Sequence, residues 1–392
     1  MADYPLAELS GKTVLEAASV PNMDLIASCR TGLVRTIPKG MEPGSDVANL
    51  SLLGYDPSLY HTGRSPLEAA SMGVDLKNTQ TAFRMNFVTL DHRSDNEILM
   101  VSHSSGDIST DEARIIVNDL NKTIMSPQIE IYPGIAYRHL LVWEDAPESI
   151  RTIPPHDVLD QNMVSYLNHE SEDPAVKLIK RSWQLLENHP VNLQRRTSGE
   201  KEANSIWLWG QGKAPKMPSF MDRFGLKGGV ISAVDLIKGI GVYAGFEPIH
   251  VEGATGYIDT NYRGKAEGAL KGLLEMDMDF IFLHVEAPDE AAHNGNYKEK
   301  IQAIESFDKD VVGTILEGLK ECEDYRIIVA SDHYTPVEKK THTMEPAPFC
   351  SATGTELKKA SGGNIYTERT AIESGIIFEA GHELMPAFLK GF

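Results

Sequence analysis

The chain has 392 residues, enough for two or three domains of roughly 150 residues each. Its formal net charge of −19 argues against a surface that binds nucleic acid or an anionic membrane. The three cysteines lie too far apart to suggest a disulfide framework, and no apolar run has the roughly 18 residues of a membrane span. We therefore expect a cytoplasmic protein with neither nucleic acid nor membrane as a partner.

The pattern of apolar residues changes twice along the chain. The first 80 residues predict short helices and turns with one strand, at 32–37. The next segment predicts strands at 83–90 and 97–101, a helix from Thr110 and a hairpin over 129–143. From about Gly228, helices alternate with short apolar runs that predict strands at 229–231, 247–251, 280–285 and 326–330. This alternation favours an α/β core with a parallel sheet, made of residues 1–82 and 201–392 and interrupted by an α+β insert over 83–200.

Metal-ligating residue types gather just past the last two predicted strands: Asp289, His293, Asp332, His333 and His342. In open α/β sheets, binding sites form beyond the carboxyl ends of the strands. Imidazole and carboxylate groups together suit zinc, manganese or a similar divalent ion. The alternative interpretation is a set of ordinary surface loop residues.

A second candidate feature is Ser45, which follows a Pro43-Gly44 turn and would cap a helix running through Leu53. A hydroxyl at a helix start lies among unpaired backbone N–H groups, which stabilise a phosphate or a developing alkoxide. The alternative is that Ser45 is only a cap. A bound divalent ion would make the hydroxyl nucleophilic, and two metals beside a serine suggest in-line phosphoryl transfer. Cationic side chains would hold the remaining charge, with Arg64, Arg84, Arg138, Arg195 or Arg196, Arg223, Arg263 and Lys213 as candidates.

Several sequence motifs are specific enough to indicate a protein family. They are TVLEAA and PNMD within 13–24, PGSD and LGYDP within 43–57, HVEAPDEAAH at 284–293, SDH at 331–333, and THT and EPAPF within 341–349. Together they closely resemble the archaeal-type 2,3-bisphosphoglycerate-independent phosphoglycerate mutases of the alkaline phosphatase superfamily. The resemblance covers almost the whole chain.

The resemblance implies an alkaline-phosphatase-like doubly wound core sheet with an inserted α+β lid domain. It also implies that Ser45 is phosphorylated while 3-phosphoglycerate and 2-phosphoglycerate interconvert, without 2,3-bisphosphoglycerate as a cofactor. One metal would lie on Asp289, His293 and His342, and a second on Asp332, His333 and Ser45. We expect manganese first, with zinc, cobalt or magnesium as alternatives.

The lid of such an enzyme excludes water that would hydrolyse the phosphoserine. Candidate residues for binding the phosphorylated substrate are Arg64, Arg84, His103, Asp107, Arg138, His156, Asp157 and Lys213. For each histidine or aspartate in this set, a satisfied core histidine or a capping aspartate is an equal alternative.

The chain departs from the family at its start. Family members open with a buried strand ending in an aspartate that binds the second metal, directly before a segment resembling 1–5. We therefore expect Met1 to correspond to an internal methionine of a longer protein, with Asp3 as a weaker substitute ligand. Two other functions stay open: a related phosphomutase or phosphatase of the superfamily, or an inactive truncated form that binds ligand without turnover.

Overall fold

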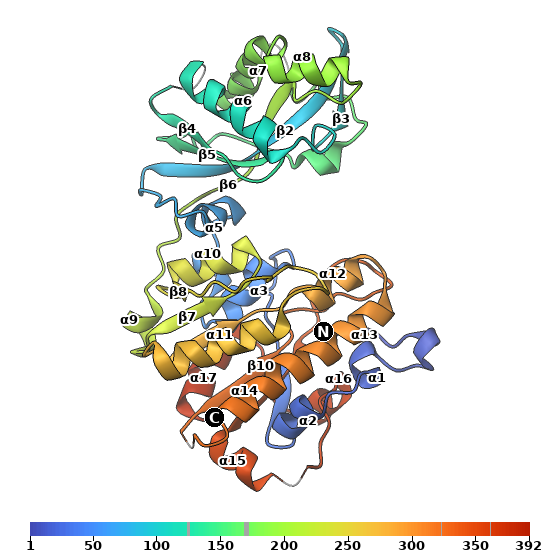
Figure 1. Cartoon of the computed structure of the whole chain (residues 1–392), viewed down its shortest axis with the longest axis vertical. Helices are drawn as coiled ribbons and strands as arrows, with labels where there is room; N and C mark the ends of the chain where they lie inside the picture. Colours follow the sequence, from blue (N-terminus) through green and yellow to red (C-terminus); the bar gives the residue numbers. More distant parts are fainter. Residues whose placement is uncertain (124–125, 168–171, 323, 361) are drawn as a thin grey trace. The chain divides into compact units, whose positions relative to one another are not determined.

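A computed structural model of the chain describes residues 1–123, 126–167, 172–322, 324–360 and 362–392. The chain forms two units, each with its own internal contacts (Figure 1). The discontinuous unit consists of Met1–His61 and Lys216–Phe392, and the inserted unit is Thr62–Pro215. Each unit mixes helices and strands, which confirms the predicted α/β class.

The strands described in the discontinuous unit form two sheets. The first has the order β10-β11-β1-β12 and the second the order β8-β7-β9. The second sheet is parallel as predicted, whereas β11 runs antiparallel to both of its neighbours, so the first sheet is mixed. The strand bounds are β1 Thr31–Val34, β7 Gly228–Ile231, β8 Glu247–Pro248, β9 Phe280–Leu283, β10 Arg326–Ala330, β11 Ala347–Thr353 and β12 Ile377–Phe378.

Helices of this unit precede, connect and follow these strands. The π-helical segment η3 (Phe307–Val312) joins two of them, α13 and α14, without a break. The helix bounds are α1 Val14–Ala17, α2 Pro21–Ala27, α3 Ser45–Leu52, α4 Pro57–Tyr60, α9 Phe220–Phe224, α10 Asp235–Tyr243, α11 Tyr262–Glu275, α12 Ala287–His293, α13 Tyr297–Ser306, α14 Gly313–Gly318, α15 Gly354–Lys359, α16 Glu368–Glu373 and α17 Leu384–Lys390, with short 3₁₀ turns at Ala7–Leu9 and Gly381–Glu383.

Helices cover both faces of the mixed sheet. Successive side chains of a strand point to opposite faces. Val329 and Cys350 accordingly pack in the cluster that includes residues of α2 and α13, whereas Val34 and Phe349 pack with residues of α3 and α17. The sheet is therefore doubly wound, as the resemblance implied.

A cavity of about 670 Å³ separates β9 from β10, and both strands line it. In the described part of the chain, β9 pairs only with β7 and β10 only with β11. The edges that face the cavity therefore keep backbone N–H and C=O groups without a strand partner. Side chains of β9 are only half-buried as a result.

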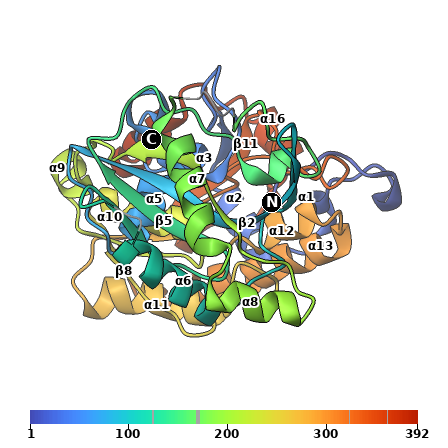
Figure 2. The same ribbon diagram turned by 90° about the horizontal axis from the view of Figure 1, so that it is seen from above.

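The inserted unit is built on one long strand, β2 (Gln80–Ser94). It pairs antiparallel with β3 (Glu97–Ser102), β5 (Arg138–Glu144) and β6 (Ser205–Lys213), and β4 (Ile129–Tyr132) extends the sheet beyond β5. Helices α6 (Thr110–Thr123), α7 (Pro174–Leu186) and α8 (Pro190–Thr197) lie over this sheet (Figure 2). Helix α5 (Arg64–Ser71) and the 3₁₀ turn η2 (Pro155–Val158) complete the unit.

The inserted unit is longer at both ends than the predicted insert of 83–200. Strand β2 begins before residue 83, and α5 packs against β2 and β6. Strand β6 follows residue 200 in sequence but completes the same sheet. The extent of the inserted unit therefore depends on which segments pair with or pack against this sheet, and local periodicity does not reveal that.

No helix within the described ranges combines the length and apolar character needed to span a bilayer.

Candidate metal centre and active site

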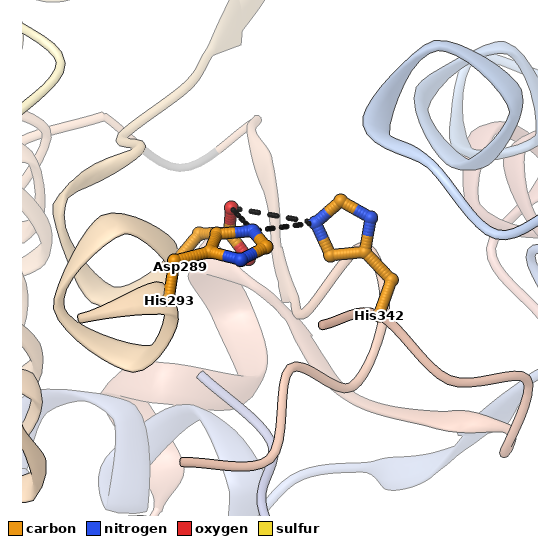
Figure 3. Close-up of side chains that lie close together, drawn as sticks. All are labelled: Asp289, His293 and His342. Carbon is orange, nitrogen blue, oxygen red and sulfur yellow. Dashed lines mark hydrogen bonds and ion pairs between the residues drawn. The ribbon is translucent and has the colours of Figure 1, made fainter. Parts of the chain in front are cut away.

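Three of the predicted ligands converge in the discontinuous unit (Figure 3). Asp289 and His293 stand one turn apart on α12 and therefore face the same side, and His342 comes from the loop before β11. His293 Nε2 lies 3.1 Å from Asp289 Oδ2 and 3.0 Å from His342 Nε2, which in turn lies 3.5 Å from Asp289 Oδ2. Two ligand atoms bound about 2.0–2.2 Å from one ion are roughly 2.8–3.6 Å apart, the shorter values belonging to octahedral and the longer to tetrahedral geometry, so this spacing suits a shared divalent ion.

The outer nitrogens of both imidazoles fix their orientation. Nδ1 of His293 donates to the Lys340 carbonyl at 2.9 Å, and Nδ1 of His342 donates to the Pro43 carbonyl at 3.3 Å. Because a carbonyl only accepts, each Nδ1 carries the proton and each Nε2 of the neutral ring presents a lone pair. A hydrogen bond from the outer nitrogen to a backbone carbonyl is the arrangement that orients metal-binding histidines. The donor set therefore fits a divalent cation.

Asp289 and His293 shift each other's pKa in opposite directions. The hydrogen bond to Asp289 raises the pKa of His293 to about 9, against the opposing effect of burial. Burial would raise the pKa of Asp289, but hydrogen bonds from His293 and His342 outweigh it and hold that pKa well below its usual range. A proton and a divalent cation thus compete for the same lone pairs.

The second group of predicted residues surrounds Ser45. Ser45 Oγ lies 3.1 Å from Nε2 of His333, which is 3.3 Å from Oδ2 of Asp332. Nδ1 of His333 donates to Thr335 Oγ1 at 3.1 Å, and that hydroxyl donates to Asp289. The Nε2 lone pair of His333 therefore faces both the serine hydroxyl and a carboxylate, a set that also suits a cation. The rings of His333 and His342 are 4.0 Å apart, so the two groups adjoin.

Ser45 does not cap its helix as predicted. Gly44, with an extended backbone, is the N-cap of α3, and Ser45 is the first helical residue. Its hydroxyl is thereby turned toward His333 instead of toward the helix amides. Asn49, one turn further on, donates to the Ser45 carbonyl at 2.8 Å and to Asp332 Oδ2 at 3.1 Å.

Two of these supporting residues were missed from the sequence. The four-residue spacing of Ser45 and Asn49 on a predicted helix is a signal that would have found Asn49. Thr335 follows His333 by two residues in a loop and offers no such signal. The proposed substitute ligand Asp3 lies elsewhere: its carboxylate is 2.8 Å from Nζ of buried Lys300.

The inserted unit brings some of the predicted substrate-binding residues together. Arg84 and His156 both contact the ring of Trp209, at 4.3 and 5.2 Å, and Asp157 lies 3.6 Å from His156. His103 and Arg138 both contact Tyr137. Lys213 lies 3.7 Å from Glu148, Asp107 is exposed in the turn after β3, and Arg64 begins α5.

The remaining arginine candidates have local roles. Arg195 and Arg196 pair with Glu112 and Glu202, and Arg263 pairs with Glu267 on the same helix. Arg223 lies over the ring of Tyr55. These contacts account for the four side chains without a ligand.

Comparison with known proteins gives two family matches. A model described as 2,3-bisphosphoglycerate-independent phosphoglycerate mutase matches residues 27–192. A model described as type I phosphodiesterase / nucleotide pyrophosphatase matches residues 158–371.

Individual relatives match over nearly the whole chain. A probable 2,3-bisphosphoglycerate-independent phosphoglycerate mutase of Geobacter sulfurreducens is 48% identical over 391 residues, 99% of this chain and 97% of the relative. The Methanosarcina barkeri protein of that name is 45% identical over 394 residues, 100% of this chain and 97% of the relative. Among solved structures, the PH0037 protein of Pyrococcus horikoshii has a TM-score of 0.81 at 30% identity, covering 100% of this chain and 94% of its own. A cofactor-independent phosphoglycerate mutase of Thermoplasma acidophilum has a TM-score of 0.66 at 22% identity, covering 100% and 96%, and shows the fold alone.

Proposed function

Because the chain belongs to the 2,3-bisphosphoglycerate-independent phosphoglycerate mutase family, we propose that it interconverts 3-phosphoglycerate and 2-phosphoglycerate through a phosphoserine at Ser45. The observation that carries this proposal is the position of Ser45 Oγ, 3.1 Å from His333 Nε2, which in turn lies 3.3 Å from Asp332 Oδ2. A hydroxyl held against the lone pair of an imidazole, which itself lies against a carboxylate, is placed to lose its proton and attack phosphorus.

The two groups of ligands would hold two divalent ions. Asp289, His293 and His342 would bind one ion, and Asp332, His333 and Ser45 the other. Such ions, when bound, lower the pKa of a hydroxyl and neutralise charge on a phosphoryl group. Mixed imidazole and carboxylate donors suit manganese, with zinc, cobalt and magnesium as alternatives.

In the proposed reaction, Ser45 accepts the phosphoryl group and then returns it. Ser45 Oγ forms a bond to phosphorus as the bond between phosphorus and the 3-oxygen of the substrate breaks. The serine hydroxyl loses its proton, and the released oxygen of glycerate takes one up. Transfer from Ser45 to the 2-hydroxyl repeats these steps in reverse and restores the serine.

The start of α3 supports the phosphorylated form of Ser45. Its first backbone N–H groups have no intrahelical acceptor, and the helix dipole favours negative charge at this end. Asn49 holds the Ser45 carbonyl and Asp332 in fixed positions through its side-chain amide. The nucleophile is therefore pre-organised by the helix that carries it.

Replacing Ser45 by alanine tests this function. We expect Ser45→Ala to abolish turnover of 3-phosphoglycerate in an enolase-coupled assay, and a chelator to abolish wild-type turnover until Mn²⁺ is restored. Ser58→Ala, at an exposed serine of α4, is the control and should keep wild-type activity. Turnover by Ser45→Ala near the wild-type rate would refute the phosphoserine route.

A second candidate function is that of a related phosphomutase or phosphatase of the same superfamily, acting on a sugar phosphate or phosphonate. The match of residues 158–371 to the phosphodiesterase / nucleotide pyrophosphatase model favours testing it. Comparing 3-phosphoglycerate with a pentose 1-phosphate and an aryl phosphate under identical metal conditions separates the two. A higher kcat/KM for the aryl phosphate would favour the hydrolase.

A further inference from the structure

One aromatic ring in the inserted unit connects several polar segments that are distant in sequence. Strands β6 and β5 pair with opposite edges of β2. Trp209 on β6 is the cross-strand partner of Arg84 on β2, and Arg138 on β5 is the partner of Asn86 on β2. Arg84 and Asn86 are two residues apart on one strand and therefore share a face of the sheet. Cross-strand partners also share a face. Arg84, Asn86, Trp209 and Arg138 thus occupy one surface.

Trp209 fixes the groups around it. The Arg84 guanidinium lies 4.3 Å from its ring centre, and the His156 ring meets it edge-on at 5.2 Å. Its indole N–H donates to Asn86 Oδ1 at 3.0 Å, and Asn86 Nδ2 donates to the His103 carbonyl at 3.1 Å. Asn86 is 3% exposed, so both hydrogen bonds are shielded from water. One indole and one amide therefore set the positions of three segments.

The contacts of Arg84 leave hydrogen-bond donors available. Glu68 occupies one edge of the guanidinium, with Nε at 3.0 Å and Nη2 at 2.5 Å from its carboxylate oxygens. Stacking on Trp209 uses the face of the guanidinium and none of its N–H groups, so the Nη1 edge can still bind an oxyanion. The Arg84 side chain is 18% exposed, which gives a small ligand access.

Arg138 adds an uncompensated charge to this surface. Within the described ranges it forms no ion pair, and its guanidinium lies 5.6 Å from the ring centre of Tyr137. Tyr137 in turn contacts the His103 ring at 5.7 Å. In a chain of net charge −19, two arginines held over aromatic rings on one face form a local site for an anion.

We propose that Trp209 and Asn86 are positioning residues of an oxyanion-binding site formed by Arg84, Arg138 and His156. Its ligand is the carboxylate or the phosphate of phosphoglycerate, so the inference rests on the proposed function for the identity of the substrate. A planar guanidinium already held in one orientation loses little side-chain entropy when it binds a carboxylate or phosphate edge-on. The packed indole thereby strengthens binding without touching the ligand.

Tryptophan emission tests this proposal directly, because all four tryptophans (Trp143, Trp183, Trp207 and Trp209) lie in the inserted unit. We expect 3-phosphoglycerate to quench the wild-type emission, and Trp209→Phe to remove the response. Trp183→Phe is the matched control, since Trp183 is also partly buried with a bonded indole N–H, donated to Ser205. Separate titrations with D-glycerate and glycerol 3-phosphate tell carboxylate recognition from phosphate recognition.

Kinetics then separate positioning from a purely structural role. We expect Trp209→Leu to raise KM about 10-fold and to leave kcat within about 3-fold, with Trp209→Phe restoring most of the KM. Trp183→Leu should change neither constant. Melting curves of every variant show which of them fold.

The outcomes decide the inference independently of the mutase proposal. Quenching that is lost in Trp209→Phe supports the site even if wild-type protein shows no mutase turnover. No quenching by any of the three ligands, or quenching that survives Trp209→Phe, overturns it. A folded Trp209→Leu variant with an unchanged KM overturns it as well.

Discussion

The hydroxyl of Thr335 joins Asp289 to His333: it donates to Asp289 Oδ1 and accepts from His333 Nδ1 at 3.1 Å. One threonine therefore orients a carboxylate of the first ligand group and an imidazole of the second. Replacing it by valine keeps the shape and removes both hydrogen bonds.

We expect Thr335→Val to weaken Mn²⁺ binding about 10- to 100-fold, as is typical when an outer-shell partner of a metal ligand is lost. Isothermal titration calorimetry measures the change. Thr335→Ser, which keeps the hydroxyl, should bind nearly as the wild type does. Equal affinities for the valine variant and the wild type would show that Thr335 has no orienting role.

Metal binding should stabilise the folded chain. At a free Mn²⁺ concentration 100 times the Kd, a ligand that binds only the native state adds about 2.7 kcal/mol to the free energy of unfolding. We expect calorimetric melting to show this gain in the wild type and its reduction in His293→Ala, which removes one ligand of the first group. His250→Ala, at an exposed histidine, should keep the whole gain. A gain of the same size in His293→Ala would contradict the assignment of His293 as a ligand.

The inserted unit should lose stability in mild acid because of His139. Burial lowers the pKa of this histidine from 6.5 to about 3, so the native state stays unprotonated while the unfolded chain takes up a proton below pH 6.5. The contribution of His139 to the free energy of unfolding is therefore fully present above pH 6.5 and is lost as the pH drops toward 3. The loss from this one group is about 2 kcal/mol at pH 5.

Urea unfolding followed by tryptophan emission measures this effect in the inserted unit alone. His139→Asn keeps an acceptor for the Gly134 N–H, now bonded to Nδ1 at 3.1 Å, and should flatten the pH dependence. His250→Asn, in the other unit, should not. An unchanged pH dependence in His139→Asn would assign the effect to other groups.

A buried ion pair ties the start of the chain to α13. Lys300 is fully buried, and its Nζ lies 2.8 Å from Asp3 Oδ2 and donates to the Thr335 carbonyl at 2.8 Å. Asp3→Ala leaves the ammonium without its counter-charge and should cost about 3–5 kcal/mol, whereas the double variant Asp3→Leu/Lys300→Met should cost less. Denaturation followed by circular dichroism compares them, with Lys298→Met at an exposed position as control. A double variant less stable than Asp3→Ala would contradict the inference that the unpaired ammonium of Lys300 causes the loss of stability.

How much the sequence predicts depends on how local each relationship is. Asp289 and His293 are one helical turn apart, and Asp332 and His333 are adjacent, so a pattern of residues places each pair. Their convergence with His342 requires the loop before β11, which the motifs of the family indicated and composition did not. The cap of α3 was misplaced by one residue, because the extended backbone of Gly44 decides it.

Pairing between strands that are distant in the sequence was harder to predict. The partnership of β2 with β6 depends on a register with an irregularity between Ala82 and Arg84, which no local pattern encodes. For that reason the domain boundaries were set too far inward, and Trp209 passed unnoticed beside Arg84. The antiparallel course of β11 is likewise a property of the tertiary fold.

The pairing of β1 with β11 also determines when each part of the chain can fold. Thr31 is the partner of Cys350, so the mixed sheet needs residues that a ribosome, adding about 5–20 residues per second, delivers last. The sheet partners of the inserted unit all lie within 80–213, so that unit can close while synthesis continues. Residues 1–61 are synthesised before the inserted unit, but their sheet partners emerge only after that unit has been synthesised. During that interval apolar side chains such as Val34, which the folded chain buries, stay exposed to water, and a slower rate of elongation prolongs their exposure.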